Sequence, residues 1–279
     1  MLEAVVNVSV GEPCPALDAV VDAAGSSLLD VHSDAWHGRS VLTLADPDPA
    51  RVEASARAVA RAAVATIDIA RHDGVHPRMG AVDVVPFVPV APPGQCGGGG
   101  IAHLDLADAL AARDAFAEYA GEGLGIPCFV YGPERTLPQV RQAAFAGLAP
   151  DTGPSAPHPT AGATCVGARE PLVAYNVWLE SADLALARRV AASLRSPVVR
   201  SLGFAVGNQV QVSCNLVAPH VVGPGAVYDA VRALAPVARA ELVGLLPAAV
   251  LAAEPPGRWD ELDLAETKTL EWRLERRQR

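Results

Sequence analysis

The order of β-prone and helical segments is the feature that most restricts how this chain can fold. The first half carries Val-rich apolar runs and helical patterns in the order 2–9 (strand), 15–24 (helix), 28–31 (strand), 41–45 (strand) and 49–71 (helix). Some predicted strands follow one another directly and others are separated by helices, which favours a mixed sheet over a fully parallel one. We therefore predict an α+β fold, an α/β sandwich.

The first half continues with a β-prone run at residues 81–90, followed by a helix, a strand and a helix at 104–120, 127–131 and 137–148. Pro86 and Pro89 lie inside the β-prone run. Because proline cannot donate to a β-ladder, we expect this run to form an edge strand or to end early.

Residues 149–162 are crowded with Pro, Gly, Ser and Thr and mark the clearest boundary, so we expect two subdomains, 1–150 and 151–279. The second half reads strand, strand, helix, strand, strand, helix, strand, which contains a ferredoxin-like unit. Gly207 and Asn208 lie between two β-prone runs and predict a hairpin turn. The halves show no usable sequence repeat, so no duplication is predicted.

Composition restricts the partners. The formal net charge of −9 argues against a nucleic-acid surface, which needs clustered Lys and Arg. The five cysteines are widely spaced and form no CxxC pair, so neither a disulfide framework nor a zinc site is indicated. No signal peptide and no apolar run of membrane-spanning length is visible. We expect a cytoplasmic protein that binds neither membrane nor nucleic acid.

One loop carries most of the chemistry: residues 71–80, RHDGVHPRMG. Imidazole transfers protons in both directions near neutral pH, and arginine offers a fixed donor fork to carboxylates. The spacing alone leaves a plainer alternative open and favours it. In that alternative His72 caps the preceding helix, Arg71 and Asp73 are solvated, and His76 bonds to local backbone.

The stretch RHDGVHPRMGAVDVVPFVPV closely resembles the signature of glutamate formiminotransferases, approximately RHxGxHPRMGAxDVxPFxPV. Further resemblances follow in the same order along nearly the whole chain: Asn7, Ser9 and Gly11; Asp30 and Arg39; Leu137, Pro138 and Arg141; Asp151, Gly153, Pro154 and Ser155; Gly162 to Thr164 and Gly167 to Arg169; Leu172, Ala174 and Asn176; Gln211 to Ser213, Asn215 and Leu216; Glu241 to Pro247. The chain thus resembles a divergent, bacterial-type member of this family, which includes the formiminotransferase domain of formiminotransferase-cyclodeaminase.

The resemblance implies a reaction. Members of the family move the formimino group of N-formimino-glutamate to N5 of tetrahydrofolate, a co-substrate, in histidine degradation and one-carbon metabolism, without a metal. It also implies a homodimer whose subdomain sheets face each other across a folate-binding cleft. The HPRMG histidine, here His76, is the expected catalytic group, since one imidazole can take the proton from N5 and supply one to the departing nitrogen.

The expected substrate- and folate-binding residues are Asn7, Asp30, His32, Arg39, Arg78, Met79, Gly80, Gly162, Thr164 and Arg169. The arginines would pair with the carboxylates of glutamate or of the folate tail. Ion pairs within the protein are the alternative for each of them.

Several residues depart from the family pattern. His32 stands where the family has an aspartate, Gly38 where it has an asparagine, and Val10 where it has a glutamate. A metal site built from His32, His37 and His76 matches no standard ligand spacing. Two other functions stay open: the same fold and folate-type cleft with a different one-carbon or amide substrate, and a non-catalytic ligand-binding homologue.

Overall fold

A computed structural model describes residues 1–72, 74, 77–91 and 105–277. These residues form two compact units, one within 1–91 and 105–170 and the other within 171–277. Within the described residues, no helix has both the length and the apolarity needed to cross a membrane.

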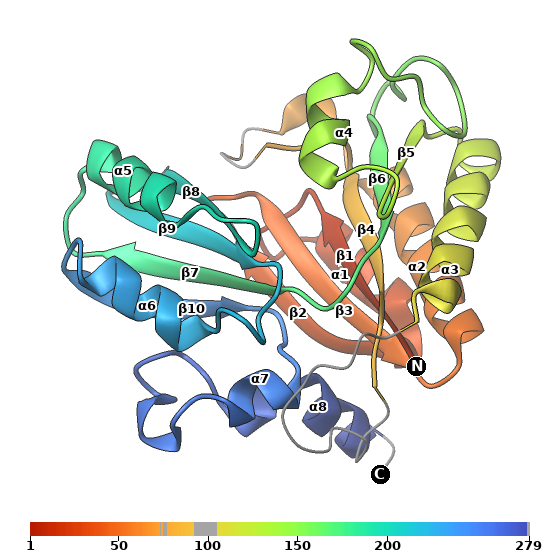
Figure 1. The fold of residues 1–279 in the computed structure, drawn as a ribbon. Helices are drawn as coiled ribbons and strands as arrows, with labels where there is room; N and C mark the ends of the chain where they lie inside the picture. Colours follow the sequence, from red (N-terminus) through yellow and green to blue (C-terminus); the bar gives the residue numbers. More distant parts are fainter. Residues whose placement is uncertain (73, 75–76, 92–104, 278–279) are drawn as a thin grey trace. The chain divides into compact units, whose positions relative to one another are not determined.

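The first unit contains a six-stranded mixed sheet in the order β2-β3-β1-β4-β6-β5 (Figure 1). Its strands are β1 (Leu2–Val8), β2 (Leu28–Asp34), β3 (Arg39–Asp46), β4 (Val82–Pro89), β5 (Cys128–Tyr131) and β6 (Thr164–Ala168). Its α-helices are α1 (Pro15–Ala24), α2 (Pro49–Thr66), α3 (Ala107–Glu118) and α4 (Leu137–Ala143). Strands β4, β6 and β5 run parallel and the other neighbours are antiparallel, so the predicted mixed sheet is confirmed.

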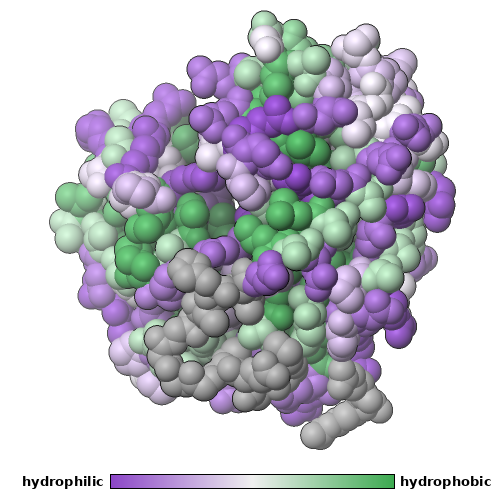
Figure 2. Space-filling model, turned by 45° about the vertical axis from the view of Figure 1, so that its right-hand side comes forward, coloured by the Kyte–Doolittle hydropathy of each residue, from purple (hydrophilic) through white to green (hydrophobic). Residues whose placement is uncertain are grey.

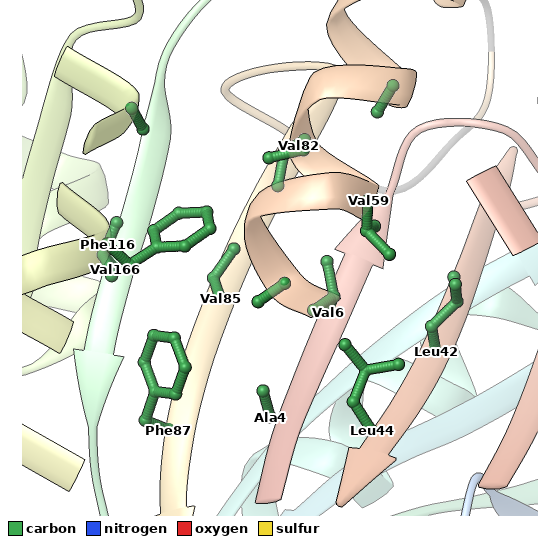
Figure 3. Close-up of a cluster of buried hydrophobic side chains, with 14 of the residues drawn as sticks. Ala4, Val6, Leu42, Leu44, Val59, Val82, Val85, Phe87, Phe116 and Val166 are labelled. Carbon is green, nitrogen blue, oxygen red and sulfur yellow. The ribbon is translucent and has the colours of Figure 1, made fainter. Parts of the chain in front are cut away.

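Helices α1, α2 and α3 pack on one face of this sheet and close its main core, part of which Figure 3 shows. Alternate residues of β1, among them Ala4 and Val6, point into this core, as the period of two in a strand requires. The rings of Phe87 and Phe116 meet edge to face there, with their centroids 5.9 Å apart. We call the opposite face of the sheet the α4 face, because α4 packs over its β5–β6 part.

The long predicted helix over 49–71 is shorter in the structure. Helix α2 begins after Asp48, whose side chain accepts a hydrogen bond from the Ala50 amide, and ends at Thr66. Ile67 is extended, and Asp68 then caps a separate 3-10 turn, Ile69–Arg71. The apolar face that indicated the helix is buried, as expected.

The prediction for residues 81–90 is wrong in one respect. Strand β4 lies inside the sheet, with β1 on one side and β6 on the other. Each proline removes only its own donor, and the strand keeps its pairing on both sides: Pro86 lies opposite Gly167 of β6 and Pro89 opposite Leu2 of β1. Two missing donors do not force a strand to the edge when the other residues continue the ladders.

The second unit is a four-stranded antiparallel sheet in the order β10-β7-β9-β8 (Figure 1). Its elements are β7 (Val173–Leu179), α5 (Leu184–Leu194), β8 (Val199–Val206), β9 (Gln209–Leu216), α6 (Pro224–Arg232) and β10 (Val237–Val243), followed by α7 (Ala248–Ala252) and α8 (Leu270–Arg277). Gly207 and Asn208 form the predicted hairpin turn. The α+β class and the ferredoxin-like order β-α-β-β-α-β are confirmed.

The two units share one topology, a similarity that the sequence did not indicate. In the first unit β1, α1, β2, β3, α2 and β4 follow one another, and their strands lie in the order β4-β1-β3-β2. The second unit repeats both the sequence of elements and the strand order, as β10-β7-β9-β8. The two copies differ in side chains, so the repeat is visible in topology and not in sequence.

The division between the units lies at residues 170 and 171, further along the chain than the expected 150 and 151. Strand β6 explains the difference, because it inserts between β4 and β5 of the first sheet. The stretch 149–162 is therefore a connection inside the first unit.

Large apolar side chains that are exposed include Trp36, Phe145, Leu202, Val221 and Leu234, which come from different elements. On the side of the molecule in Figure 2, hydrophobic residues lie in small groups between hydrophilic ones. Of these residues, Trp36 lies in the turn between β2 and β3, which forms part of the candidate site described below.

Candidate active site

Several strand ends meet at one edge of the first sheet. The end of β1 pairs with the start of β3 and of β4, through Val8 opposite Ser40 and Val82. Strand β6 runs parallel to β4, so its start lies at the same edge. The candidate residues Asn7, Arg39, Met79, Gly80 and Gly162 therefore come together, although they are far apart in sequence.

Asp83 enters this edge through a β-bulge. Asn7 pairs with Val84 and Val8 with Val82, which leaves Asp83 as the extra residue of β4. A bulge redirects a side chain that regular alternation would place elsewhere. Here it puts the Asp83 carboxylate within reach of two arginines, and the residue is fully buried.

Asp83, Arg39 and Arg141 form a cluster of one carboxylate and two guanidiniums. Oδ2 of Asp83 accepts from Nη2 of Arg39 at 2.5 Å and from Nη2 of Arg141 at 2.6 Å. Burial acts to raise the pKa of the Asp83 carboxyl, but the two positive charges and the Met79 amide outweigh it, and the pKa lies below its usual value. Asp83 is therefore ionised at neutral pH.

The same cluster holds the segment that follows His76. The Pro77 carbonyl accepts a hydrogen bond from Arg39 at 3.1 Å and from Arg141 at 2.9 Å. The Met79 amide donates to Oδ1 of Asp83 at 2.7 Å. His76 itself, together with Asp73 and Val75, lies outside the described residues.

The other end of the loop lies against the β2–β3 turn. Nε2 of His72 is 2.8 Å from the Gly38 carbonyl, and Nδ1 accepts from the Gly74 amide at 3.0 Å. Both ring nitrogens of His72 therefore have polar partners in the backbone. Arg78 contacts the His72 ring and donates from Nη2 to the carbonyls of His37 at 3.1 Å and Gly74 at 2.6 Å. His72 thus bonds to this turn.

Gly80 is required by a close approach of two backbones. It bridges Gly162, and a Cβ at Gly80 would lie 2.2 Å from the Ala163 carbonyl oxygen. The Ser9 hydroxyl donates to the Gly80 carbonyl at 2.7 Å. Any side chain at position 80 would push the loop away from β6.

Asp30 and His32 lie on the α4 face of the sheet, on β2. His32 and Asn7 both pair with Val41 of β3, so they share one row across the sheet, with two strand spacings or about 10 Å between their Cα atoms. Asp30 is two residues before His32 in the same strand and faces the same way. The structure thus brings Asn7, Asp30, His32 and Arg39 to one face.

Thr164 and Arg169 are placed differently from this group. The Thr164 side chain is buried on the helix-covered side, and its hydroxyl donates to the Val82 carbonyl at 2.7 Å. Arg169 follows β6, five residues or about 16 Å along the strand from Thr164. Its Nη1 donates to the Glu170 carbonyl at 2.9 Å.

Tyr131 is close enough to Arg169 and Arg141 for both guanidinium charges to act on its hydroxyl group. Its ring lies across Gly167, where an added Cβ would be 2.1 Å from the tyrosine Cζ. Burial raises the pKa of Tyr131 to about 12, although both Arg169 and Arg141 act to lower it. The phenol is therefore a neutral donor or acceptor between two cations at neutral pH.

Asp34 and His37 are in polar contact in the β2–β3 turn, with Nδ1 of His37 at 2.8 Å from Oδ2 of Asp34. Burial acts to raise the pKa of Asp34, but hydrogen bonds from His37 lower it further, so the net direction is down. Among the residues that the structure describes, no group of three or more His, Cys, Asp or Glu side chains could hold a metal ion. The contact of His37 in this turn is with the Asp34 carboxylate.

Two residues of the site were not among the predicted site residues: Asp83 and Arg141. Both were visible as parts of the resemblance, in the stretch after HPRMG and in the Leu137–Pro138 segment. Nothing in the spacing linked one with the other, because their contact depends on the bulge in β4 and on the position of α4.

The structure combines an α+β fold with a histidine-containing loop at one edge of a sheet. The loop lies beside the buried carboxylate of Asp83 and its two arginine partners. These are features of an enzyme that acts on small molecules. The family model described as formiminotransferase domain, N-terminal subdomain, matches residues 1–169. The chain belongs to the formiminotransferase family. The end of this match lies next to the division between the two units.

Named relatives agree with this family. The chain is 35% identical over 243 residues to the glutamate formimidoyltransferase of Streptococcus pyogenes serotype M1. The aligned region covers 78% of this chain and 77% of that protein. It is 33% identical over 281 residues to the glutamate formimidoyltransferase of Thermoplasma acidophilum, with 88% of both chains covered. The formimidoyltransferase-cyclodeaminase of Sus scrofa is 34% identical over 284 residues, and the match spans 50% of its length.

Proposed function

We propose that this chain transfers the formimino group of N-formimino-glutamate to N5 of tetrahydrofolate, with His76 as general acid and base. The observation that carries the proposal is the intact HPRMG segment in a chain that is 35% identical to a glutamate formimidoyltransferase. The anchoring of Pro77 and Met79 by Asp83, Arg39 and Arg141 supports it, since a catalytic loop needs a fixed geometry.

The chemistry needs one group that moves protons both ways. N5 of tetrahydrofolate attacks the amidine carbon and forms a new C–N bond. The N5 proton must then leave, and the glutamate nitrogen must gain one as its bond to that carbon breaks. An imidazole with a pKa near neutral accepts the first proton and supplies the second. Tetrahydrofolate is a co-substrate, and no step requires a metal.

The binding roles divide by position. Asn7, Asp30 and His32 are assigned to the donor and the pterin, because they lie on the α4 face of the sheet. Arg78, Arg39 and Arg169 are assigned to carboxylates, as additional contacts beside those they make within the protein. Met79, Gly80, Gly162 and Thr164 shape the backbone around the substrate through the Gly80–Gly162 bridge and the Thr164–Val82 hydrogen bond.

We further assign the protein to the cytoplasm, as a homodimer. The family resemblance motivates the dimer, and sedimentation of the full chain tests it. A single monomeric species at micromolar concentration would refute it.

The decisive experiment is a transfer assay with N-formimino-glutamate and tetrahydrofolate, followed by acid conversion of the product to methenyl-tetrahydrofolate. We expect turnover in the wild type and a loss of at least about 100-fold in His76→Ala, in the range of general acid–base catalysis. His220→Ala, which changes an exposed histidine of the second unit, is the matched control and should keep full activity.

Folded wild-type protein without turnover would refute the reaction. The departures at Val10, His32 and Gly38 would then indicate one of the alternatives, and folate binding separates them. Bound tetrahydrofolate would favour a different one-carbon or amide donor for the same site. Loss of folate binding would leave a non-catalytic homologue.

A further inference from the structure

Asp83 and Pro77 are held by the same two side chains. Arg39 and Arg141 each donate one hydrogen bond to the Asp83 carboxylate and one to the Pro77 carbonyl. The carbonyl is therefore fixed from two sides by cations that a single buried anion orients. A backbone carbonyl with two charged donors is held more firmly than one with a single neutral partner.

The position of Pro77 in the sequence links this arrangement to the expected catalytic residue. Pro77 directly follows His76, and consecutive Cα atoms are about 3.8 Å apart. Proline also fixes its own φ, so an anchored Pro77 carbonyl fixes the backbone directly after His76. The Met79 amide, on Oδ1 of Asp83, anchors the chain again two residues later.

We propose that Asp83 and Arg141 are positioning residues that fix the loop carrying His76, and that Arg39 joins them in this role. The proposal rests on the proposed function for its effect on catalysis. It assigns the main task of Arg39 to the loop, since its Nη1 donates to Asn7 at 2.8 Å and its Nη2 to Asp83 and Pro77.

Charge and burial explain why this cluster can act as a unit. Burial acts to lower the pKa of Arg39, and Asp83 opposes this effect. Removing the Asp83 charge would leave two guanidiniums side by side in a largely buried place without their shared anion. The arginines would then separate, and the Pro77 carbonyl would lose at least one of its donors.

The first test measures the loop without any substrate. Hydrogen exchange of the backbone amides in residues 78–82 is compared between wild type and Asp83→Asn. We expect the Met79 amide to exchange at least tenfold faster in the variant, since its acceptor has lost its charge and its orientation. Unchanged exchange would overturn the proposal, whether or not the protein is an enzyme.

The second test separates positioning from substrate binding in the transfer assay. We expect Arg141→Ala to lower kcat by at least tenfold with both KM values within about twofold, and millimolar guanidinium to restore part of the rate. A raised KM with unchanged kcat would overturn the proposal, because it would make Arg141 a substrate-binding group. Asp83→Asn should also lose kcat, without rescue by guanidinium.

Arg113→Gln is the matched control. Arg113 is a buried arginine of the same unit, paired with Glu134 at 2.8 Å on the helix-covered side, and it should leave kcat unchanged. A wild type without turnover would refute the proposed reaction, and amide exchange alone would then decide whether the cluster holds the loop.

Discussion

The imidazole of His72 lies against the backbone of Gly38, in the space that a side chain at position 38 would need. A Cβ added there would be 2.3 Å from Cε1 of His72, and Gly38 has a φ of +58°. A glycine at position 38 therefore leaves room for the His72 ring. This pair joins the β2–β3 turn to the loop.

We expect Gly38→Ala to destabilise the protein by about 2–3 kcal/mol, measured by urea unfolding. Positive φ costs alanine about 1–2 kcal/mol, and the lost His72–Gly38 hydrogen bond adds about 1 kcal/mol. Gly25→Ala is the control, since Gly25 has a φ of +60° with nothing within 4 Å of an added Cβ. Equal losses in the two variants would mean that the His72 ring moves aside freely.

We expect the free energy of unfolding of Asp83→Asn to change less with pH in the acidic range than that of the wild type. The folded-state pKa of Asp83 is lowered, so its contribution is present above the unfolded pKa near 3.9 and is lost as the pH falls through the folded value. We expect a deficit of about 3–5 kcal/mol at pH 7, as for one broken buried pair, that shrinks below about pH 4. Asp108→Asn, an exposed position on α3, should stay within about 0.5 kcal/mol.

Urea unfolding at several pH values between about 3 and 7 measures the Asp83 deficit. A deficit that stays the same at every pH would show that the amide fails for reasons of shape. The charge of Asp83 would then have no part in the stability of this edge of the sheet.

The buried cysteines should be slow to react in the native protein. Burial raises the pKa of the Cys128, Cys165 and Cys214 thiols to about 12. At pH 8 only about one thiol in 10⁴ would then be a thiolate, the reactive form. We expect alkylation of these three to be at least about 100-fold slower than that of the half-buried Cys14, followed by peptide mass spectrometry. The Sγ atom of Cys165 lies 3.2 Å from Sδ of Met79, and labelling of Cys165 at the rate of Cys14 would show that this contact opens readily.

The sequence was informative where local pattern decides structure, and less so where distant segments meet. Hydrophobic periodicity located β1 and α2, and the Gly207–Asn208 turn followed from residue type. The interior position of β4 was missed because the pairing of neighbours outweighs the loss of two proline donors. The bulge at Asp83 leaves no local signal, since it depends on the register between β1 and β4.

The topological repeat was missed for a related reason. A β-α-β-β-α-β unit needs only apolar alternation and turns at suitable places, and many different side chains satisfy it. Residue-by-residue comparison of β1 with β7 therefore finds little, although both strands occupy the same place in their sheets. Resemblance to a family located the loop and His76, which spacing alone did not favour.

The boundary between the units leads to a test with fragments. A fragment of residues 171–279 carries a complete four-stranded sheet with its own buried core, including Tyr175, Val212 and Leu242. We expect it to fold alone, with cooperative thermal unfolding. A fragment of residues 1–170 keeps β6 and should fold as well.

Fragments cut at the composition boundary should behave differently. Residues 1–150 lack β6, the strand that lies between β4 and β5, so both of these strands would lose a neighbour. Residues 151–279 would carry β6 as an unpaired apolar strand, which favours aggregation. We expect both to be largely insoluble or non-cooperative in circular dichroism melts. A well-folded 1–150 fragment would show that the first sheet is stable without its β5–β6 extension, and that the connection at 149–162 is the true division of the chain.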